Sequence, residues 1–158
     1  MDRINARTVC VVALGSNLGD RRAHLDFAVS RLRSFLNPLN VSSYYETEPA
    51  GVAEPQPLFL NAAVVGETTL PAREVLDRLL AIERERGRER PHPNAARTLD
   101  LDLILFGDSV IARPDLVVPH PRFRERRFVL EPLVEIAPAV RDPVTGKTAA
   151  ELLARFPC

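Results

Sequence analysis

The sequence has few cysteines, a single lysine and no long apolar run. Cys10 lies inside an apolar stretch and Cys158 is the last residue, so neither belongs to a disulfide framework or to a cluster of metal ligands. No run of about 18 apolar residues is present to cross a bilayer. Residues 1–7 also lack the apolar core of a secretion signal. We therefore expect a cytoplasmic protein that has no membrane partner.

Net charge is also missing, and its absence argues against one class of partner. The 21 basic and 21 acidic residues balance to a formal charge of zero. A protein that binds nucleic acid generally gains affinity from an excess of basic residues. We therefore expect no nucleic-acid partner.

Arginine supplies all of the basic residues except Lys147. A compositional bias explains the number of arginines but not their grouping between Arg84 and Arg97 and between Arg122 and Arg127. A guanidinium presents a planar fork of donors that suits phosphate oxygens. Two arginine clusters near carboxylates are therefore compatible with a polyphosphate site.

The chain has the length of one domain, with 158 residues of which 46% are hydrophobic and 27% charged. We expect a single domain over residues 1–158. Apolar periodicity and turn residues predict strands at 8–14, 40–47, 59–68 and 100–106, with a helix after the first strand (from Asp20) and another after the third (opened by Pro71).

This βαββαβ order is the ferredoxin-like arrangement. Further helices are predicted at 126–136 and 149–155, where they would cover the open face of the sheet. The expected fold class is therefore α+β, a ferredoxin-like βαββαβ core with additional C-terminal helices that forms a three-layer α-β-α sandwich.

The most informative stretch runs from Arg97 to Phe106 and places Asp100 and Asp102 inside an apolar run. Alternate residues of a strand share a face, so both carboxylates point away from Leu99, Leu101, Leu103 and Leu105. Their α-carbons would lie roughly 6–7 Å apart, where two unit charges repel by about 2–3 kcal/mol. One or two divalent cations would offset this repulsion, and Mg²⁺ suits carboxylate oxygens and arrives with substrate phosphates.

A half-solvated sheet edge would show the same alternation of Asp and Leu. Ile104 and Phe106 argue against that alternative, because they continue the carboxylate face as apolar residues and indicate partial burial. Partly buried carboxylates usually have partners.

Several other polar and aromatic residues allow either a binding or a structural role. Asn61, an amide in an apolar strand, could bind the edge of a flat heterocycle or be a satisfied core group. Phe59 and Phe128 could stack on such a ring or belong to the core. The turn at 15–19 before a helix is similar to phosphate-binding turns, but it lacks the Lys-Ser/Thr ending of a P-loop.

The charged residues outside the acidic strand are also open to two interpretations. Glu83 could pair with Arg88 at the end of a helix. His120, held between two prolines, could donate to phosphate or serve only the turn. The irregular segments 48–58 and 88–96 could act as lids or as solvated connectors.

Short motifs over nearly the whole chain resemble those of one enzyme family. They are ALGSNLGD at 13–20, YET at 45–47, FLNAAV at 59–64, Ile82-Glu83 with Gly87-Arg88, RTLDLDL at 97–103, VPH at 118–120 and RRFVLEPL at 126–133. The RTLDLD string followed by the Pro-His element is highly specific. The chain is thereby similar to the 6-hydroxymethyl-7,8-dihydropterin pyrophosphokinases, the folate-pathway enzymes that move a pyrophosphoryl group from ATP to the pterin alcohol.

The resemblance implies a role for each matching position. Asp100 and Asp102 would hold two Mg²⁺ ions on the triphosphate and, with Arg88 and Arg97, would be the catalytic residues. The implied ATP contacts are Glu83, Arg88, Arg97, His120 and Arg126. The implied pterin pocket consists of Thr47, Phe59, Asn61 and Phe128. The implied partners are ATP and the dihydropterin, and we expect a monomer.

The alternative is a non-catalytic ferredoxin-like module that binds nucleic acid or another protein. Such a module needs exposed stacking aromatics and a basic sheet face. The face that carries Asp100 and Asp102 is acidic, which counts against it.

Overall fold

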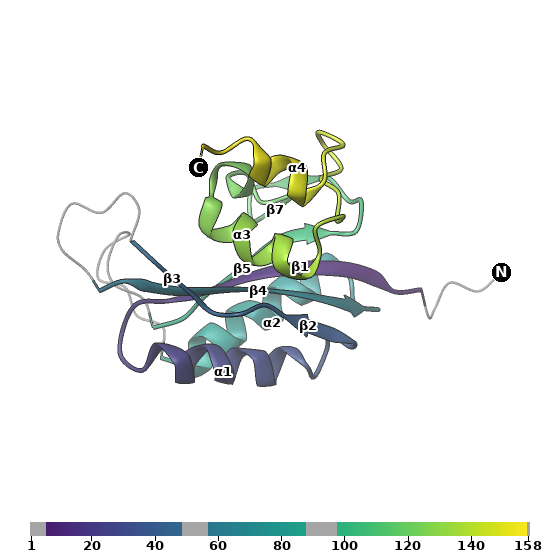
Figure 1. Cartoon of the computed structure of the whole chain (residues 1–158). Helices are drawn as coiled ribbons and strands as arrows, with labels where there is room; N and C mark the ends of the chain where they lie inside the picture. Colours follow the sequence, from purple (N-terminus) through teal and green to yellow (C-terminus); the bar gives the residue numbers. More distant parts are fainter. Residues whose placement is uncertain (1–5, 49–56, 88–97, 158) are drawn as a thin grey trace.

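A computed structural model describes residues 6–48, 57–87 and 98–157, and its centre is an antiparallel sheet with helices on both faces (Figure 1). The sheet order is β2-β4-β1-β5, and β3 also pairs with β4. The strands are β1 (Thr8–Ser16), β2 (Leu39–Val41), β3 (Tyr45–Thr47), β4 (Phe59–Thr68) and β5 (Asp100–Phe106). This order confirms the ferredoxin-like arrangement.

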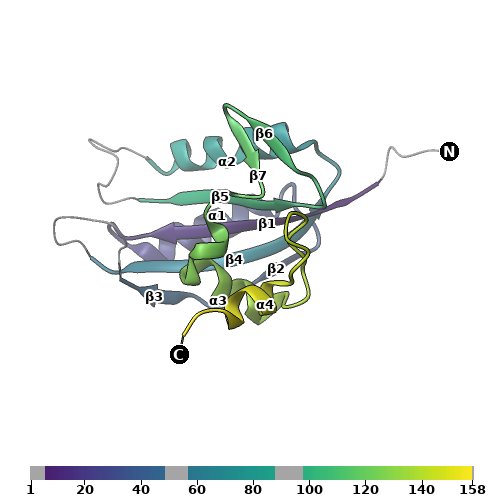
Figure 2. The same ribbon diagram turned by 90° about the horizontal axis from the view of Figure 1, so that it is seen from above.

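Two pairs of helices make the outer layers. One face of the sheet is covered by α1 (Arg21–Leu32) and α2 (Ala72–Glu85), and the other by α3 (Arg127–Ile136) and α4 (Ala149–Ala154) (Figures 1 and 2). The chain between β5 and α3 forms a small hairpin and a short 3₁₀ turn. These are β6 (Ile111–Arg113), β7 (Leu116–Val118) and η1 (Phe123–Glu125).

The helices begin where the sequence predicts them. Asp20 caps α1, since its carboxylate accepts a hydrogen bond from the backbone N–H of Ala23 at 3.1 Å. Pro71, the N-cap of α2, has no N–H to leave unsatisfied. Thr148 and Glu151 form a reciprocal capping box on α4. The helices that the structure describes include none that is both long and apolar enough to span a membrane.

Each face of the sheet has its own apolar core. Val12 and Leu14 of β1 pack toward α1 and α2, where they meet Leu25 and Leu79. Alternate residues of the same strand point the other way, and Val11 packs with the cluster under α3 and α4. The cluster under α3 and α4 also contains Ala63, Ile104, Leu130, Leu133 and Leu152.

The strand predicted at 40–47 is wrong in one respect, because the structure divides it into β2 and β3. The backbone N–H of Ser42 donates to Ala63 O at 2.9 Å, but the N–H of Ala63 donates to the hydroxyl of Ser42 instead of a ladder carbonyl. The buried serine side chain thus replaces one rung of backbone pairing and ends the ladder there.

The alternation predicted along β5 is also wrong beyond Leu103. The ladder with β1 pairs Val12 with Leu103 and Val11 with Leu105, so Ile104 is an extra residue at a β-bulge. The bulge shifts the pattern by one position. Leu105 therefore joins Ile104 on the α3 side, and Phe106, expected on the carboxylate face, packs on the opposite side.

Candidate active site

One row of residues across four strands carries the polar groups of the candidate site. Asp100 of β5 pairs with Gly15 of β1, Gly15 pairs with Asn61 of β4, and Asn61 pairs with Tyr45 of β3. Cross-strand partners project from the same face of a sheet. The next row, which contains Asp102, Ala13 and Ala63, lies on this face too. The acidic pair and the predicted pterin amide therefore share the face that α3 covers.

Gly15, in the middle of this row, lets the neighbouring side chains approach its backbone closely. A β-carbon at this position would lie 3.1 Å from Asn61 Oδ1 and 3.6 Å from Cδ1 of Phe59. The side chains of Asn61 and Phe59 therefore lean over the backbone of Gly15. Without a side chain of its own, Gly15 gives the site a backbone floor between the amide and the carboxylates.

The predicted pterin residues of β3 and β4 contact one another. Asn61 is 5% exposed, and its Nδ2 donates a hydrogen bond to the hydroxyl of Thr47. Thr47 pairs in turn with Phe59. Phe128, the fourth predicted member, lies in the first turn of α3, where the Arg126 guanidinium stacks 5.6 Å from its ring centre. The structure thus brings three of the four together and places Phe128 on the helix above their face.

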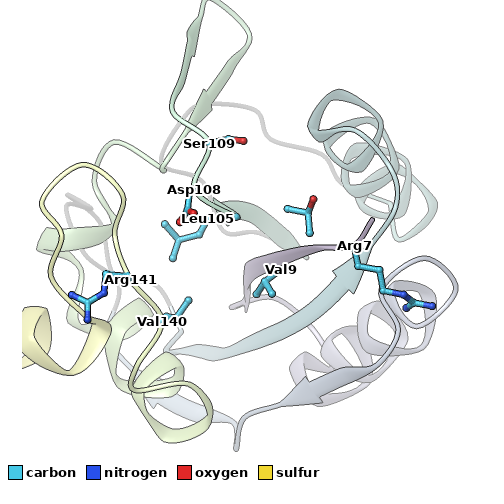
Figure 3. A pocket seen from close by; sticks show the side chains of 9 residues that line it. Arg7, Val9, Leu105, Asp108, Ser109, Val140 and Arg141 are labelled. Atoms are coloured by element: carbon cyan, nitrogen blue, oxygen red, sulfur yellow. The ribbon is translucent and has the colours of Figure 1, made fainter. Parts of the chain in front are cut away.

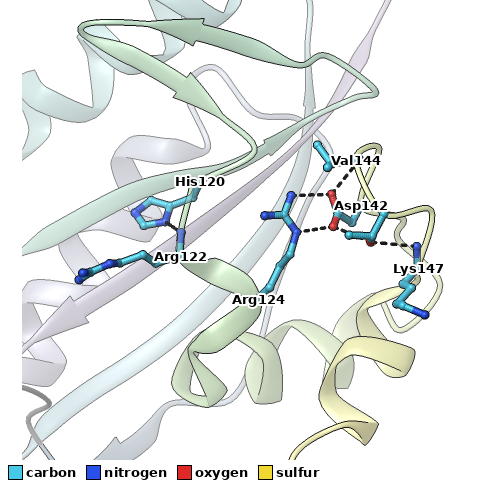
Figure 4. Close-up of polar contacts among 7 residues, drawn as sticks. His120, Arg122, Arg124, Asp142, Val144 and Lys147 are labelled. Carbon is cyan, nitrogen blue, oxygen red and sulfur yellow. Dashed lines mark hydrogen bonds and ion pairs between the residues drawn. The ribbon is translucent and has the colours of Figure 1, made fainter.

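His120 lies beside the acidic strand. Its backbone N–H donates to Ile104 O at 2.9 Å, and its Nδ1 accepts from the N–H of Arg122 at 3.1 Å (Figure 4). Burial, more than any other cause, lowers the pKa of His120, and Arg126 and Arg122 lower this pKa further while Asp102 raises it. Because Nδ1 is an acceptor, the neutral ring carries its proton on Nε2. The neutral ring of His120 is therefore a hydrogen-bond donor through Nε2, close to the charges of Asp102 and Arg126.

Glu83 supports the acidic strand from the other side of the sheet. Its carboxylate is almost fully buried, and Oε2 accepts a hydrogen bond from the backbone N–H of Leu101 at 2.7 Å. Among the described residues β5 is the last strand of the sheet, and there no neighbouring strand pairs with this N–H. Glu83 fills that place and fixes the backbone between Asp100 and Asp102. Its predicted place near the nucleotide stays a prediction.

The donor set of Asp100 and Asp102 fits a hard cation that brings its other ligands with it. Both side chains are half-buried, and they project from one face two residues apart. In the described part of the chain, no cluster of three or more histidine, cysteine or acidic residues could hold a metal. Mg²⁺ usually binds through one or two carboxylates together with water and substrate phosphates. The predicted Arg88 and Arg97 lie outside the described residues.

A family model described as 7,8-dihydro-6-hydroxymethylpterin-pyrophosphokinase (HPPK) matches residues 11–138, a range that contains every site residue named above. The chain belongs to this family. It is accordingly an enzyme of the pyrophosphokinase class.

Two curated relatives named 2-amino-4-hydroxy-6-hydroxymethyldihydropteridine pyrophosphokinase extend the HPPK match. The Bacillus subtilis protein is 45% identical over 140 residues, which cover 87% of this chain and 83% of the relative. The Pseudomonas aeruginosa protein is 41% identical over 148 residues, which cover 92% and 90%.

The fold is also that of solved HPPK domains. A crystal structure of Plasmodium falciparum HPPK-DHPS superposes with a TM-score of 0.76 and 17% sequence identity, over 98% of this chain. The chain spans about half of that longer protein, 47% of its length. At this identity the likeness concerns the fold.

Sequence analysis missed a cluster that joins α3 of this HPPK chain to β3. The Glu135 carboxylate accepts hydrogen bonds from the Tyr45 hydroxyl at 2.6 Å and from the Ser43 hydroxyl at 2.9 Å. The bond to Glu135 is the main cause that raises the pKa of Tyr45 to about 12. Tyr45 sits next to Asn61 in the ladder, so the cluster holds the pterin strands against the helix. The sequence carries no local signal for this cluster, because Tyr45 and Glu135 are 90 residues apart in the chain.

A second missed cluster fixes the chain on both sides of α3. The Arg124 guanidinium donates two hydrogen bonds to the buried carboxylate of Asp142, which also accepts from the Thr145 hydroxyl and the N–H of Val144 (Figure 4). Burial opposes ionisation of Asp142, but these hydrogen bonds outweigh it and lower the pKa to about 2. The cluster therefore secures η1, which leads into Arg126 and Phe128.

A separate pocket of about 660 Å³ opens at the far end of the sheet (Figure 3). Val9 of β1 and Leu105 of β5 line it, whereas the candidate site lies at Gly15 and Asp100, the opposite ends of the same strands. The guanidinium of Arg7, which also lines the pocket, donates to the carbonyl of Asn37. The pocket is therefore distinct from the candidate active site.

Proposed function

We propose that the chain transfers the pyrophosphoryl group of ATP to the hydroxymethyl group of 6-hydroxymethyl-7,8-dihydropterin, in a Mg²⁺-dependent reaction of folate biosynthesis that releases AMP. Family membership supports the reaction. The observation that carries the proposal is the row of Asn61, Gly15 and Asp100, which sets a buried amide and a pair of carboxylates on either side of a backbone floor.

The pterin side of the site would consist of Thr47, Phe59, Asn61 and Phe128. The amide of Asn61 is held by Thr47, so its Oδ1 has a fixed direction over Gly15. An oriented amide can match the donors and acceptors of a flat heterocycle. Phe59 comes from the sheet and Phe128 from α3, the helix that covers this face, so the two rings can take the two faces of the heterocycle.

The nucleotide side would consist of Asp100 and Asp102 with Glu83, Arg88, Arg97, His120 and Arg126. Two Mg²⁺ ions held by the aspartates would, when bound, neutralise triphosphate charge and polarise the β-phosphorus. Arg88, Arg97 and Arg126 would bind phosphate oxygens as planar forks. His120 would add the Nε2–H donor of its neutral ring.

In the reaction, the pterin hydroxyl loses its proton to solvent and its oxygen bonds to the β-phosphorus. The bond from that phosphorus to the α-phosphate oxygen breaks, so AMP leaves with that oxygen. Such a transfer requires position and charge stabilisation more than covalent help from the protein. Arg88 and Arg97 are therefore assigned as the catalytic cations. We further propose that residues 1–158 act as one domain, as a monomer, in the cytoplasm.

The test is to incubate the protein with ATP, Mg²⁺ and the reduced pterin and to analyse the nucleotide product. AMP formed in step with pterin diphosphate supports the proposal. ADP would indicate an ordinary kinase, and no turnover at all would favour the binding module.

Two substitutions examine the acidic pair. Asp100→Ala and Asp102→Ala should each abolish most turnover with little change in the melting temperature, because both side chains are half-buried and each substitution relieves repulsion. Asp108→Asn is the matched control, since this exposed carboxylate lies beyond the far end of β5. Tight Mg²⁺-dependent binding of ATP in both alanine variants would contradict the metal role.

A further inference from the structure

His24 connects two parts of the fold that both lead to the candidate site. It lies in the first turn of α1, which follows the turn at 15–19. Its Nδ1 accepts a hydrogen bond from Nε–H of Arg86, the C-cap residue of α2, at 2.8 Å. The Leu18 backbone acts on the ring as well, since it raises the pKa of His24. A β-carbon added to Gly19 would lie 3.3 Å from its Nε2, so this nitrogen faces the turn.

This arrangement requires the neutral ring with its proton on Nε2. Nδ1 must keep a lone pair to accept from Arg86, so in the neutral ring Nε2 carries the hydrogen. Arg86 itself is held in place, since its guanidinium stacks 4.7 Å from the ring centre of Phe27. Arg31 stacks on the same ring at 4.8 Å. The imidazole therefore meets a fixed donor.

Both elements joined by His24, the end of α2 and the start of α1, are linked to the acidic strand through neighbouring residues. Arg86 belongs to the last turn of α2, where its N–H donates to the carbonyl of Glu83. The Glu83 carboxylate holds the N–H of Leu101 between the two aspartates. On the other side, the Leu18 turn continues β1 directly from Gly15, the partner of Asp100.

We propose that His24 is a positioning residue for the pyrophosphokinase reaction, whose neutral imidazole ties the end of α2 to the start of α1, directly after the turn that follows β1. It would thereby keep Glu83, and with it the acidic strand, in register with Gly15. No substrate contact is assigned to it. The inference rests on the proposed function only for its kinetic consequence, because the structural link exists without substrate.

Protonation of His24 should break the link. Nδ1 then becomes a donor and faces the Nε–H of Arg86. Burial and Arg86 lower the pKa of His24, whereas the Leu18 backbone and Asp20 raise it. Arg86 from α2 and Asp20 at the N-terminus of α1 are the charged groups that act on it, and the lowered pKa keeps the ring neutral at pH 7.

The experiment compares His24→Leu, His24→Gln and Arg86→Lys at pH 7.5. His24→Leu removes the hydrogen bond from Arg86 and should raise the KM for Mg·ATP roughly five- to tenfold, the effect of one lost hydrogen bond, with kcat nearly unchanged. Glutamine has an oxygen acceptor and an N–H donor, so His24→Gln should restore most of the affinity. Arg86→Lys keeps the charge without the Nε–H and should behave like His24→Leu.

Two readouts separate this inference from the proposed function. Amide exchange at Leu101 should quicken in His24→Leu and return toward the wild-type rate in His24→Gln, whether or not AMP is formed. As the pH falls below about 6.5, the wild-type KM should rise more steeply than that of His24→Gln, in which His120 still titrates. An unchanged KM and Leu101 exchange rate in His24→Leu, or a His24→Gln variant as impaired as His24→Leu, would overturn the inference.

Discussion

At the scale of single residues, Gly15 shows how the absence of a side chain shapes the candidate site. Its backbone is the floor between Asn61 and Asp100, and the nearest side-chain atom to an added β-carbon would be the Asn61 oxygen at 3.1 Å. Few β-carbon contacts are as short as this, so any larger residue must displace the amide that we assign to the pterin.

Gly15→Ala is therefore expected to weaken pterin binding. The displaced Asn61 would lose alignment with the heterocycle, and the loss of about one hydrogen bond should weaken the affinity roughly fivefold to tenfold. Isothermal titration with the dihydropterin measures the change, and nucleotide affinity in the same variant is the internal control. Equal loss of both affinities would mean that the floor does not serve the pterin specifically.

Asp142 should make stability depend on acid. Its native pKa of about 2 lies below the unfolded value of about 3.9. The stabilisation is therefore complete above the unfolded pKa and is lost as the pH falls from about 4 toward 2. Asp142→Asn should lower the free energy of unfolding by about 2 kcal/mol at pH 7 and flatten its fall below pH 4.

Urea denaturation at pH 7 and pH 3 measures both effects of the Asp142 substitution. Asp115→Asn is a fitting control, because Asp115 makes an ion pair with Arg73 at 2.7 Å but its side chain is 71% exposed. Exposed pairs contribute little to stability. A similar loss in both variants would show that charge alone, and not the buried hydrogen bonds, produces the effect.

At the scale of elements, α3 and β3 depend on each other through Glu135. The carboxylate accepts from the hydroxyls of Tyr45 and Ser43 and from the N–H of Ser43. β3 has three residues, and in the part of the chain that the structure describes it pairs with β4 alone, so backbone pairing gives it little support of its own. The helix supplies the rest.

Glu135→Leu should loosen β3 and the Thr47–Asn61 contact that it carries. We expect the free energy of unfolding to fall by roughly 1–2 kcal/mol, which lowers the melting temperature by several degrees. The KM for the pterin should rise several-fold. Glu131→Gln is the matched control on the same helix, because Glu131 makes a surface ion pair with Arg127 and acts on Tyr45 by its charge, as the last of the causes that raise the Tyr45 pKa. A lower melting temperature with an unchanged pterin KM would limit Glu135 to stability.

The sequence predicts helices and strands better than the bulges and breaks within them. Period-two alternation correctly put Asp100 and Asp102 on one face and Leu101 and Leu103 on the other. It misplaced Phe106, because the bulge at Ile104 depends on pairing with β1, which is distant in sequence. The break at Ser42 has the same kind of cause, a hydroxyl bound to the backbone of β4.

At the scale of the whole molecule, the three-layer sandwich could be predicted because the apolar periodicity of each helix and strand indicates which face is buried. The pairing of Asp100 with Gly15 and of Gly15 with Asn61 could not, since alternation gives faces but not the register between strands. Short sequence motifs identified the candidate site residues, but their positions relative to one another follow from the pairing of the strands. The contacts of Glu135 and His24 join residues roughly 60 to 90 positions apart and leave no local pattern. Asp142 is different, because its bonds to Val144 and Thr145 are local and only its pair with Arg124 is not.

Removal of magnesium should impair the enzyme through a single effect, the loss of affinity for ATP. Without a cation, the triphosphate would face the charges of Asp100 and Asp102, so ATP affinity in excess EDTA should fall roughly tenfold or more. Titration of a non-hydrolysable ATP analogue with and without Mg²⁺ measures this loss. In Asp102→Ala the two affinities should converge, and an undiminished magnesium effect there would argue against this cation site.

The contact between Glu83 and Leu101 also affects how the sheet meets its surroundings. A terminal strand with open N–H groups is a template onto which another chain can add, the first step of edge-to-edge aggregation. Because a carboxylate of the same chain occupies that donor at 2.7 Å, an incoming strand would have to displace a buried charge before it could pair. The strand that carries Asp100 and Asp102 is thereby protected from intermolecular β-addition at Leu101.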